Sequence, residues 1–224
     1  MNKTNVDWKN PKEGWELTHV WNPIIGCKRN CSKETHGFDC WARKMNNFVQ
    51  WIPEWTKPQI IEKQYYEPKF PMDLNSTIWI GELSDICYWE YEWLVDVLIK
   101  KRQPVIYRNM FLTKEPRIYR MAEDCFVDEK DWLGLTVTEG KNTLEEFLEI
   151  KEKGNYSDLR LKPPNLFLSI EPLLGSFNDV DLSNVDLVIV GADSSAKPVV
   201  PKKEWIKSIQ HDNIYFKNNI RKYL

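Results

Sequence analysis

Short apolar runs that alternate with helical patterns are the feature that most constrains how this chain folds. Six runs have the length and composition of buried strands, at residues 77–81, 105–112, 132–137, 166–170, 185–190 and 214–216. Segments with helical spacing separate them, at 91–102, 115–122, 142–153 and 201–210. Strands that alternate with helices are typical of a parallel sheet with helical crossovers. With a first strand at 17–21, the pattern predicts an α/β fold, an incomplete parallel (β/α) barrel of about six to seven strands.

The 224 residues show no break in composition, which predicts a single domain over 1–224. Residues 1–16 are polar and are interrupted by a proline and a glycine, so we expect an N-terminal arm there. A helix is expected over 41–51, ending before Pro53. The proline-rich stretch 52–71 predicts an irregular crossing within the domain.

Composition and charge limit the classes of partner. The chain carries 31 basic and 33 acidic residues, a formal net charge of −2, which gives no general attraction to nucleic acid. No apolar run approaches the length of a membrane span, so we expect a cytoplasmic protein without membrane contact. Eleven tryptophans and nine tyrosines indicate a core or pocket rich in flat aromatic surface. These features favour a small-molecule substrate.

Three of the five cysteines lie in one stretch directly after the first expected strand. Cys27, Cys31 and Cys40 have the spacing C-x3-C-x8-C. Thiolates on one loop bind soft metals, either zinc or an iron–sulfur cluster, and three thiolates on a four-iron cluster leave one iron open. The residues alone leave two other interpretations: His36 completes a Cys3His zinc site, or the cysteines bind no metal and act as small buried apolar residues. The odd number of cysteines argues against a disulfide framework. The two remaining cysteines, expected to be structural, are Cys87 and Cys125.

Polar side chains follow several of the expected strands at the point where each strand ends. In parallel β/α folds, functional groups gather at the carboxyl ends of the strands. The candidate residues at these ends are Gly81, Glu82, Ser84, Asp85, Lys114, Thr136, Glu171 and Asp193. A serine or threonine in such a place is also a common helix cap. Glu171, between Ile170 and Pro172, is instead a carboxylate at the end of an apolar strand, where it needs a partner.

Several short blocks that together span nearly the whole chain resemble the signature blocks of a small phage-type radical S-adenosylmethionine (SAM)-like family. The blocks are Asn22-Pro23-x-x-Gly26-Cys27, Cys40-x-Ala42-Arg43, Phe111-Leu112-Thr113-Lys114, Trp132-Leu133-Gly134, Ser169-Ile170-Glu171-Pro172-Leu173-Leu174 and Val188-Ile189-Val190-Gly191. The second block is also distantly similar to the spore photoproduct lyases, and Trp41 supplies the aromatic residue that follows the last cysteine of such loops. The chain departs from the family pattern in the insertion 32–39 before Cys40, and in Thr138, where relatives often carry an acid.

The resemblance implies that Cys27, Cys31 and Cys40 hold a [4Fe–4S] cluster whose open iron binds the amino and carboxylate groups of SAM. An electron donor such as flavodoxin or ferredoxin would then drive cleavage of SAM to a 5′-deoxyadenosyl radical, which abstracts hydrogen from the substrate. The residues that the resemblance implies for binding SAM are Trp41, Gly81, Glu82, Ser84, Asp85, Lys114 and Thr136.

Within this group, the size of the chain and its Asn/Lys/Ile-rich composition are most similar to the queuine lyases of queuosine salvage. The similarity implies a deazapurine base as substrate, and release of 7-aminomethyl-7-deazaguanine from queuine. Glu171 and Asp193 are the candidates for reading the N–H donors of such a base. Two alternatives stay open. One is a zinc-binding phage-type accessory or adaptor protein, and the other is a radical SAM enzyme that acts on nucleic acid, such as a photoproduct lyase.

Overall fold

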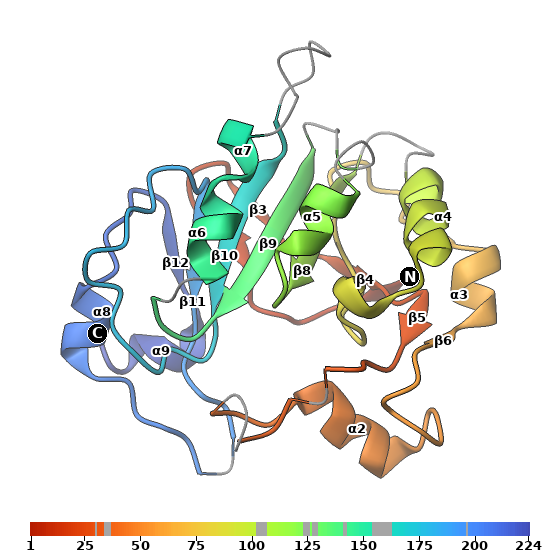
Figure 1. Ribbon diagram of the computed structural model, residues 1–224, viewed down its shortest axis with the longest axis horizontal. Helices are drawn as coiled ribbons and strands as arrows, with labels where there is room; N and C mark the ends of the chain where they lie inside the picture. The colour runs from red at the N-terminus through yellow and green to blue at the C-terminus, as the bar shows by residue number, and fades with distance from the viewer. Residues whose placement is uncertain are drawn as a thin grey trace.

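A mostly parallel sheet forms the centre of the molecule (Figure 1). The computed structural model describes residues 1–29, 31–33, 37–101, 107–122, 126, 130–140, 143–153, 163–195 and 197–224. In these residues, the strands of the main sheet are β1 (Asn2–Lys3), β4 (His19–Trp21), β7 (Thr77–Ile80), β8 (Arg108–Thr113), β9 (Asp131–Val137), β10 (Asn165–Ile170), β11 (Leu187–Val190) and β12 (Ile214–Phe216). Their order is β1-β4-β7-β8-β9-β10-β11-β12, so β1 and β12 are the two edges and the sheet is open.

The seven strands from β4 to β12 are all parallel and lie in the order in which they occur along the chain. Only β1 is antiparallel to its neighbour, β4. The prediction of an α/β fold with a parallel sheet is therefore confirmed, and each of the seven expected strands is present. Because strands adjacent in sequence are adjacent in the sheet, every connection in this sheet steps in the same direction.

Most of the helices cover one face of the sheet, and α2 (Trp41–Val49) lies apart from it (Figure 1). Those described are α2, α3 (Glu62–Tyr66), η1 (Ile86–Tyr88), α4 (Tyr91–Lys101), α5 (Arg117–Met121), α6 (Thr143–Leu148), α7 (Ile150–Lys153), α8 (Lys203–Lys207) and α9 (Asn218–Arg221). Alternate residues of a strand point to opposite faces, so Ile78 and Ile80 of β7 pack against the helices while Trp79 faces the other way. The helical side of this core includes Leu94, Val97, Ile118, Phe147, Ile206 and Ile220.

The N-terminal segment covers the other face, and the expectation of a polar arm is wrong for its apolar residues. Residues 1–16 contain β1 and a short antiparallel pair, β2 (Lys9–Asn10) and β3 (Trp15–Glu16). Trp8 and Trp15 are buried. Together with Leu17 they pack against Val20, Trp79, Met110, Trp132, Phe167, Leu187, Ile189 and Tyr215. The red segment runs behind the sheet in Figure 1, opposite the helices.

Hydrogen bonds fix this segment to the far edge of the sheet. Tyr215 in β12 donates its hydroxyl proton to Asp7 Oδ1 at 2.5 Å, and the backbone N–H of Asn218 donates to Asp7 Oδ2 at 2.8 Å. Asn213 Nδ2 donates to Asn10 Oδ1 at 3.1 Å. Since β1 pairs with β4, one short segment joins the first edge of the sheet to the last.

The stretch 52–71 is less irregular than expected. It contains β6 (Gln59–Ile60), which pairs antiparallel with β5 (Ile24–Ile25), and the short helix α3. In Figure 1, α2 lies at the bottom of the view, apart from the helices that cover the sheet. None of the helices in the described part of the chain is long and apolar enough to cross a membrane.

Candidate functional site

A cavity of about 400 Å³ lies at the carboxyl ends of the parallel strands, between the sheet and the cysteine loop. All of the candidate residues from the sequence line it: Cys27, Cys31, Cys40, Trp41, Gly81, Glu82, Ser84, Asp85, Lys114, Thr136, Glu171 and Asp193. They converge because parallel strands end at one edge of the sheet. The structure thus brings the candidates together, while their chemical roles remain predictions.

The cysteine loop is seated on the segment that follows α2. Cys27 donates its backbone N–H to the carbonyl of Trp55 at 2.8 Å. Gly26 has a φ of +93°, and a Cβ atom there would lie 2.8 Å from the Trp55 oxygen and 2.9 Å from Ile52 Cδ1. Only glycine adopts this conformation without strain and leaves this space, so Gly26 allows the loop to approach.

Burial governs the acidity of the two inner thiols. Burial raises the pKa of the Cys27 thiol to about 11, although backbone N–H groups of Asp85 and Arg29 that bond to the sulfur act in the opposite direction. Burial also raises the pKa of Cys31. These thiols therefore carry protons at neutral pH, and a metal that binds them has to displace those protons.

The donor set fits an iron–sulfur cluster in kind: three sulfur atoms, which soft metals prefer, line one cavity, and backbone N–H groups bond to one of the sulfurs. Within the described residues, no three His, Cys, Asp or Glu side chains lie close enough together to hold a single metal ion. His36, the fourth ligand of the zinc interpretation, and Cys125 lie outside the described residues. Cys87 is a free, partly buried thiol outside the cavity lining.

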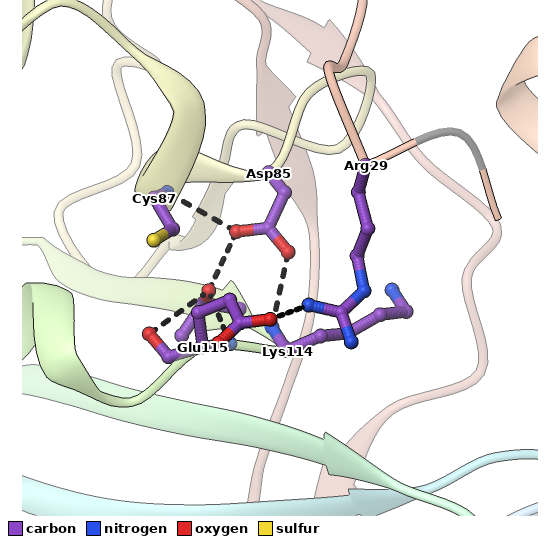
Figure 2. A network of polar contacts seen from close by, with 6 residues as sticks. Arg29, Asp85, Cys87, Lys114 and Glu115 are labelled. Atoms are coloured by element: carbon purple, nitrogen blue, oxygen red, sulfur yellow. Dashed lines mark hydrogen bonds and ion pairs between the residues drawn. The ribbon is translucent and has the colours of Figure 1, made fainter. Parts of the chain in front are cut away.

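Asp85 holds the ends of two neighbouring strands together (Figure 2). Its Oδ1 accepts hydrogen bonds from Thr113 Oγ1 at 2.5 Å and from the backbone N–H of Cys87 at 3.1 Å. Its Oδ2 accepts from the backbone N–H of Lys114 at 3.0 Å. Because both carboxylate oxygens have partners in the protein, the geometry favours a positioning role for Asp85 over the SAM contact that the resemblance implies.

An ion pair fixes the cysteine loop to the same strand end (Figure 2). Arg29, between Cys27 and Cys31, contacts the carboxylate of Glu115 through its Nη1. Both side chains are largely shielded from solvent, with 19% and 30% exposed. Arg29 and Glu115 did not stand out in the sequence, because their partnership depends on a loop meeting a strand 86 residues further along the chain.

Ser84 and Glu82 differ in how free their side chains are. Ser84 donates its hydroxyl to the Gly26 carbonyl and accepts a hydrogen bond from Trp89 Nε1 at 2.9 Å, so its hydroxyl is committed to the fold. Glu82 is contacted by Asn22 Nδ2 at 3.4 Å, and burial raises its pKa. Glu82 therefore keeps acceptor capacity for a cation in the cavity.

The two acids expected to read a substrate have different surroundings. Lys217, directly after β12, donates from Nζ to Glu171 Oε1 at 2.5 Å, and both side chains line the cavity. In the described residues, Glu171 Oε2 accepts no hydrogen bond. The partner that a carboxylate at the end of an apolar strand needs is thus Lys217, which follows a strand end like the other candidates.

Asp193 organises the loop in which it lies. Its Oδ1 accepts from the Ser195 N–H at 2.8 Å, and its Oδ2 accepts from Ser195 Oγ and from the Val199 N–H, both at 3.0 Å. Burial alone would raise the pKa of Asp193, but these hydrogen bonds outweigh it and lower the pKa. The geometry therefore favours Glu171 over Asp193 as the group left free for a ligand.

Two indole rings line the inner side of the cavity. Trp8 from the N-terminal segment and Trp79 from β7 stack with ring centroids 4.5 Å apart. Their Nε1 donors, together with the Thr136 hydroxyl, are buried and have no hydrogen-bond partner among the described residues. Unpaired buried donors are uncommon and indicate an acceptor, either water or a ligand, at this end of the sheet. Trp8 had no recognisable signal in a segment that we expected to be polar.

The fold and the cavity define an α/β protein with a thiol-lined pocket at the carboxyl edge of an open parallel sheet. The chain belongs to the family described as "Protein of unknown function (DUF5131)", whose sequence profile matches residues 12–218. Neither a curated protein nor a solved structure matches the chain.

Proposed function

We propose that the protein is a radical SAM enzyme that acts on a small flat base, with queuine as the best candidate substrate and 7-aminomethyl-7-deazaguanine as the product. The observation that carries this proposal is the cavity itself. Three cysteines of one loop and the polar residues of six strand ends line one cavity. The parallel strands in chain order, with helices on one face, support the further proposal that the open sheet is an incomplete (β/α) barrel.

Cys27, Cys31 and Cys40 would hold the [4Fe–4S] cluster as thiolates. When bound, the cluster would supply SAM with one electron taken from an external reductant, and the C5′–sulfur bond of SAM would break to give methionine and a 5′-deoxyadenosyl radical. The chain's own groups bind and orient. The Glu82 carboxylate accepts hydrogen bonds from the SAM ammonium group, and Lys114, whose charge lies near both inner thiols, faces the negative charge of the loaded site.

Substrate binding would use the side of the cavity away from the cysteines. The stacked Trp8 and Trp79 rings offer aromatic surface and unpaired N–H donors to a flat heterocycle. Glu171 Oε2 accepts from the N–H donors of the base, and Lys217 keeps the carboxylate charge paired and donates to a carbonyl oxygen of the same edge. These features support a flat base with adjacent donors and an acceptor, and the resemblance of the chain selects queuine among such bases.

Anaerobic reconstitution followed by iron and sulfide analysis tests the proposal. We expect about four iron atoms and four sulfides per chain. With SAM and dithionite the protein should then produce 5′-deoxyadenosine, and with queuine also 7-aminomethyl-7-deazaguanine. Each of the substitutions Cys27→Ser, Cys31→Ser and Cys40→Ser should abolish cluster binding. Cys87→Ser, which changes a thiol outside the cavity, is the matched control and should retain the cluster. Stoichiometric zinc with no deoxyadenosine would instead support the adaptor protein.

A further inference from the structure

Trp55, in the segment that follows α2, is a buried tryptophan whose indole N–H has no hydrogen-bond partner. The residue is 7% exposed, and its Nε1 is one of the buried nitrogen atoms that lack a partner in the described part of the chain. Folded proteins leave few buried donors unpaired, so an acceptor is expected beside this one. Trp8 and Trp79, which also line the cavity with unpaired donors, belong to a separate apolar cluster. Trp55 therefore requires an acceptor of its own.

The side chains packed around Trp55 carry sulfur and little oxygen or nitrogen. Trp55 belongs to one apolar cluster with Cys27, and Cys40 packs against the same cluster. All three residues line the cavity. Apart from Tyr88, the other side chains of this cluster are aliphatic: Ile25, Ala42, Ile52, Ile61 and Leu83. The side-chain acceptors close to the indole N–H are therefore chiefly sulfur atoms. A thiol is a weak acceptor, whereas a sulfur atom that carries negative charge is a stronger one.

Hydrogen bonds hold Trp55 beside the cysteine loop. Its carbonyl oxygen accepts from the backbone N–H of Cys27 at 2.8 Å. Nearer to α2, Asn46 Nδ2 donates to the carbonyl of Ile52 at 3.0 Å, and the Ile52 N–H donates back to Asn46 Oδ1 at 3.0 Å. The position of Trp55 is thus coupled to that of a proposed cluster ligand, and its donor is in place before a cofactor binds.

Backbone donors already contact the sulfur of Cys27. The N–H groups of Asp85 and Arg29 bond to it. The Trp55 N–H would add a side-chain donor to these two. One-electron reduction adds a negative charge to an iron–sulfur cluster, and hydrogen bonds to its sulfur atoms stabilise the reduced form and raise its reduction potential. A hydrogen bond in apolar surroundings is stronger than one in water, which makes a buried donor effective here.

We propose that Trp55 tunes the reduction potential of the cluster: its indole N–H donates a hydrogen bond to a sulfur atom of the bound cluster, a sulfide or a cysteine thiolate, and stabilises the reduced form. The inference rests on the proposed function, because it needs the [4Fe–4S] cluster. It assigns a role to a residue outside the cysteine loop. The same hydrogen bond would supply the acceptor that Trp55 lacks among the described residues.

An anaerobic redox titration of the reconstituted protein tests the proposal without turnover. Dithionite reduces the cluster stepwise, and electron paramagnetic resonance measures the reduced fraction at each potential. Trp55→Phe keeps an aromatic ring and removes the N–H donor. At a fixed potential the ratio of reduced to oxidised cluster should fall about tenfold, since a hydrogen bond to a charged group is lost. For a one-electron couple that corresponds to a midpoint potential about 59 mV lower than in the parent.

The matched control is Trp132→Phe. It removes the same ring atoms from a tryptophan that is 1% exposed and lies outside the cavity lining. Its midpoint potential should equal that of the parent, because Trp132 packs in the cluster of the N-terminal segment and not beside the cysteines. An equal fall in both variants would overturn the proposal, since general loosening of the core would then explain the shift.

A second variant separates the lost donor from lost packing. Replacing Trp55 by 3-benzothienylalanine puts a sulfur atom in place of the N–H and keeps the shape of the ring. This variant should retain the iron of the parent and show the same lowered potential, even where Trp55→Phe loses iron. A parent-like potential in the benzothienyl variant would overturn the role of Trp55 and leave the proposed function standing. A parent protein that binds no iron–sulfur cluster would contradict the proposed function, and this inference with it.

Discussion

At the scale of single residues, Glu171 and Asp193 differ in whether a carboxylate oxygen is left without a hydrogen-bond partner among the described residues. Glu171 is paired through one oxygen with Lys217, and Asp193 uses both oxygens to hold its own loop. In the sequence Glu171 directly follows an apolar strand and Asp193 comes after a Gly-Ala turn, but this difference does not show which carboxylate keeps an oxygen for a ligand. Only the positions of Lys217 and of the Ser195 and Val199 N–H groups decide between them.

We predict that Glu171→Gln weakens binding of 7-aminomethyl-7-deazaguanine by about 1.5–3 kcal/mol, roughly tenfold to a hundredfold. The amide offers one acceptor in place of a charged carboxylate, so a charge-assisted hydrogen bond to the base is lost. Calorimetric titration measures the affinity. Asp193→Asn is the matched control, and equal affinities for Glu171→Gln and the parent would reject Glu171 as the reader.

For Asp193 we predict a loss of stability. Asp193→Asn should lower the free energy of unfolding by about 1 kcal/mol at pH 7, because an amide replaces a carboxylate that accepts three hydrogen bonds. The folded-state pKa is lowered, so this contribution is present above the ordinary aspartate pKa and is lost as the pH falls through the lowered value. Urea unfolding of both proteins at neutral and at acid pH measures it.

In that experiment the difference in free energy of unfolding between Asp193→Asn and the parent should be smaller at acid pH than at neutral pH. Asp181→Asn is a useful comparison, since Asp181 Oδ1 accepts from the Ser183 N–H at 2.9 Å in a similar turn outside the cavity. A difference between Asp193→Asn and the parent that stays constant down to acid pH would contradict the assigned role of the Asp193 charge.

At the scale of elements, the strands and long helices could be predicted because each carries its own apolar pattern. Residues 132–137 and 166–170 are recognisable without knowledge of their neighbours, and β9 and β10 are found there. The pairs β2–β3 and β5–β6 have two residues per strand, too few to show a period. These strands pair only because the folded chain brings them together. The same holds for the hydrogen bonds of Asp85 and the Arg29–Glu115 ion pair around the cysteine loop, so none of these contacts could be predicted from local sequence.

At the scale of elements, we predict that the close approach of Gly26 to Trp55 and Ile52 is needed to hold the cysteine loop in place. Gly26→Ala should cost about 1–3 kcal/mol of stability and lower the iron retained after reconstitution, because the added Cβ meets the Trp55 carbonyl and Ile52 at a positive φ. Gly14→Ala is the matched control: Gly14 also has a positive φ, +72°, but no atom lies within 4 Å of the added Cβ. Iron content and thermal unfolding are measured on both. A normal iron content in Gly26→Ala would show that the loop does not need the close contact of Gly26 with Trp55 and Ile52 to bind the cluster.

At the scale of the whole molecule, the N-terminal segment completes both the core and the cavity. It covers the sheet face that the helices leave bare, and its Trp8 lines the pocket. The composition of the segment suggested a solvated arm, yet its two tryptophans outweigh its charged residues once the opposite sheet face is apolar.

Trp8→Ala should therefore lower the free energy of unfolding by about 3–5 kcal/mol, as expected for truncation of a buried tryptophan. Trp51→Ala, which removes a half-exposed ring, serves as the control and should cost less than about 1 kcal/mol. Denaturant unfolding of the three proteins compares them. Equal losses for the two variants would mean that the segment contributes little to the packed core.

The hydrogen bond between Tyr215 and Asp7 joins residues 208 positions apart. During synthesis on the ribosome Asp7 emerges long before Tyr215, so this anchor cannot form until β12 has been made. Contacts of such long sequence separation also slow folding, because a large loop has to close before they contribute. In a nascent chain that lacks only β12, the N-terminal segment does not yet have its hydrogen bonds to Tyr215 and Asn218. The sheet face opposite the helices is therefore incompletely covered until β12 is added.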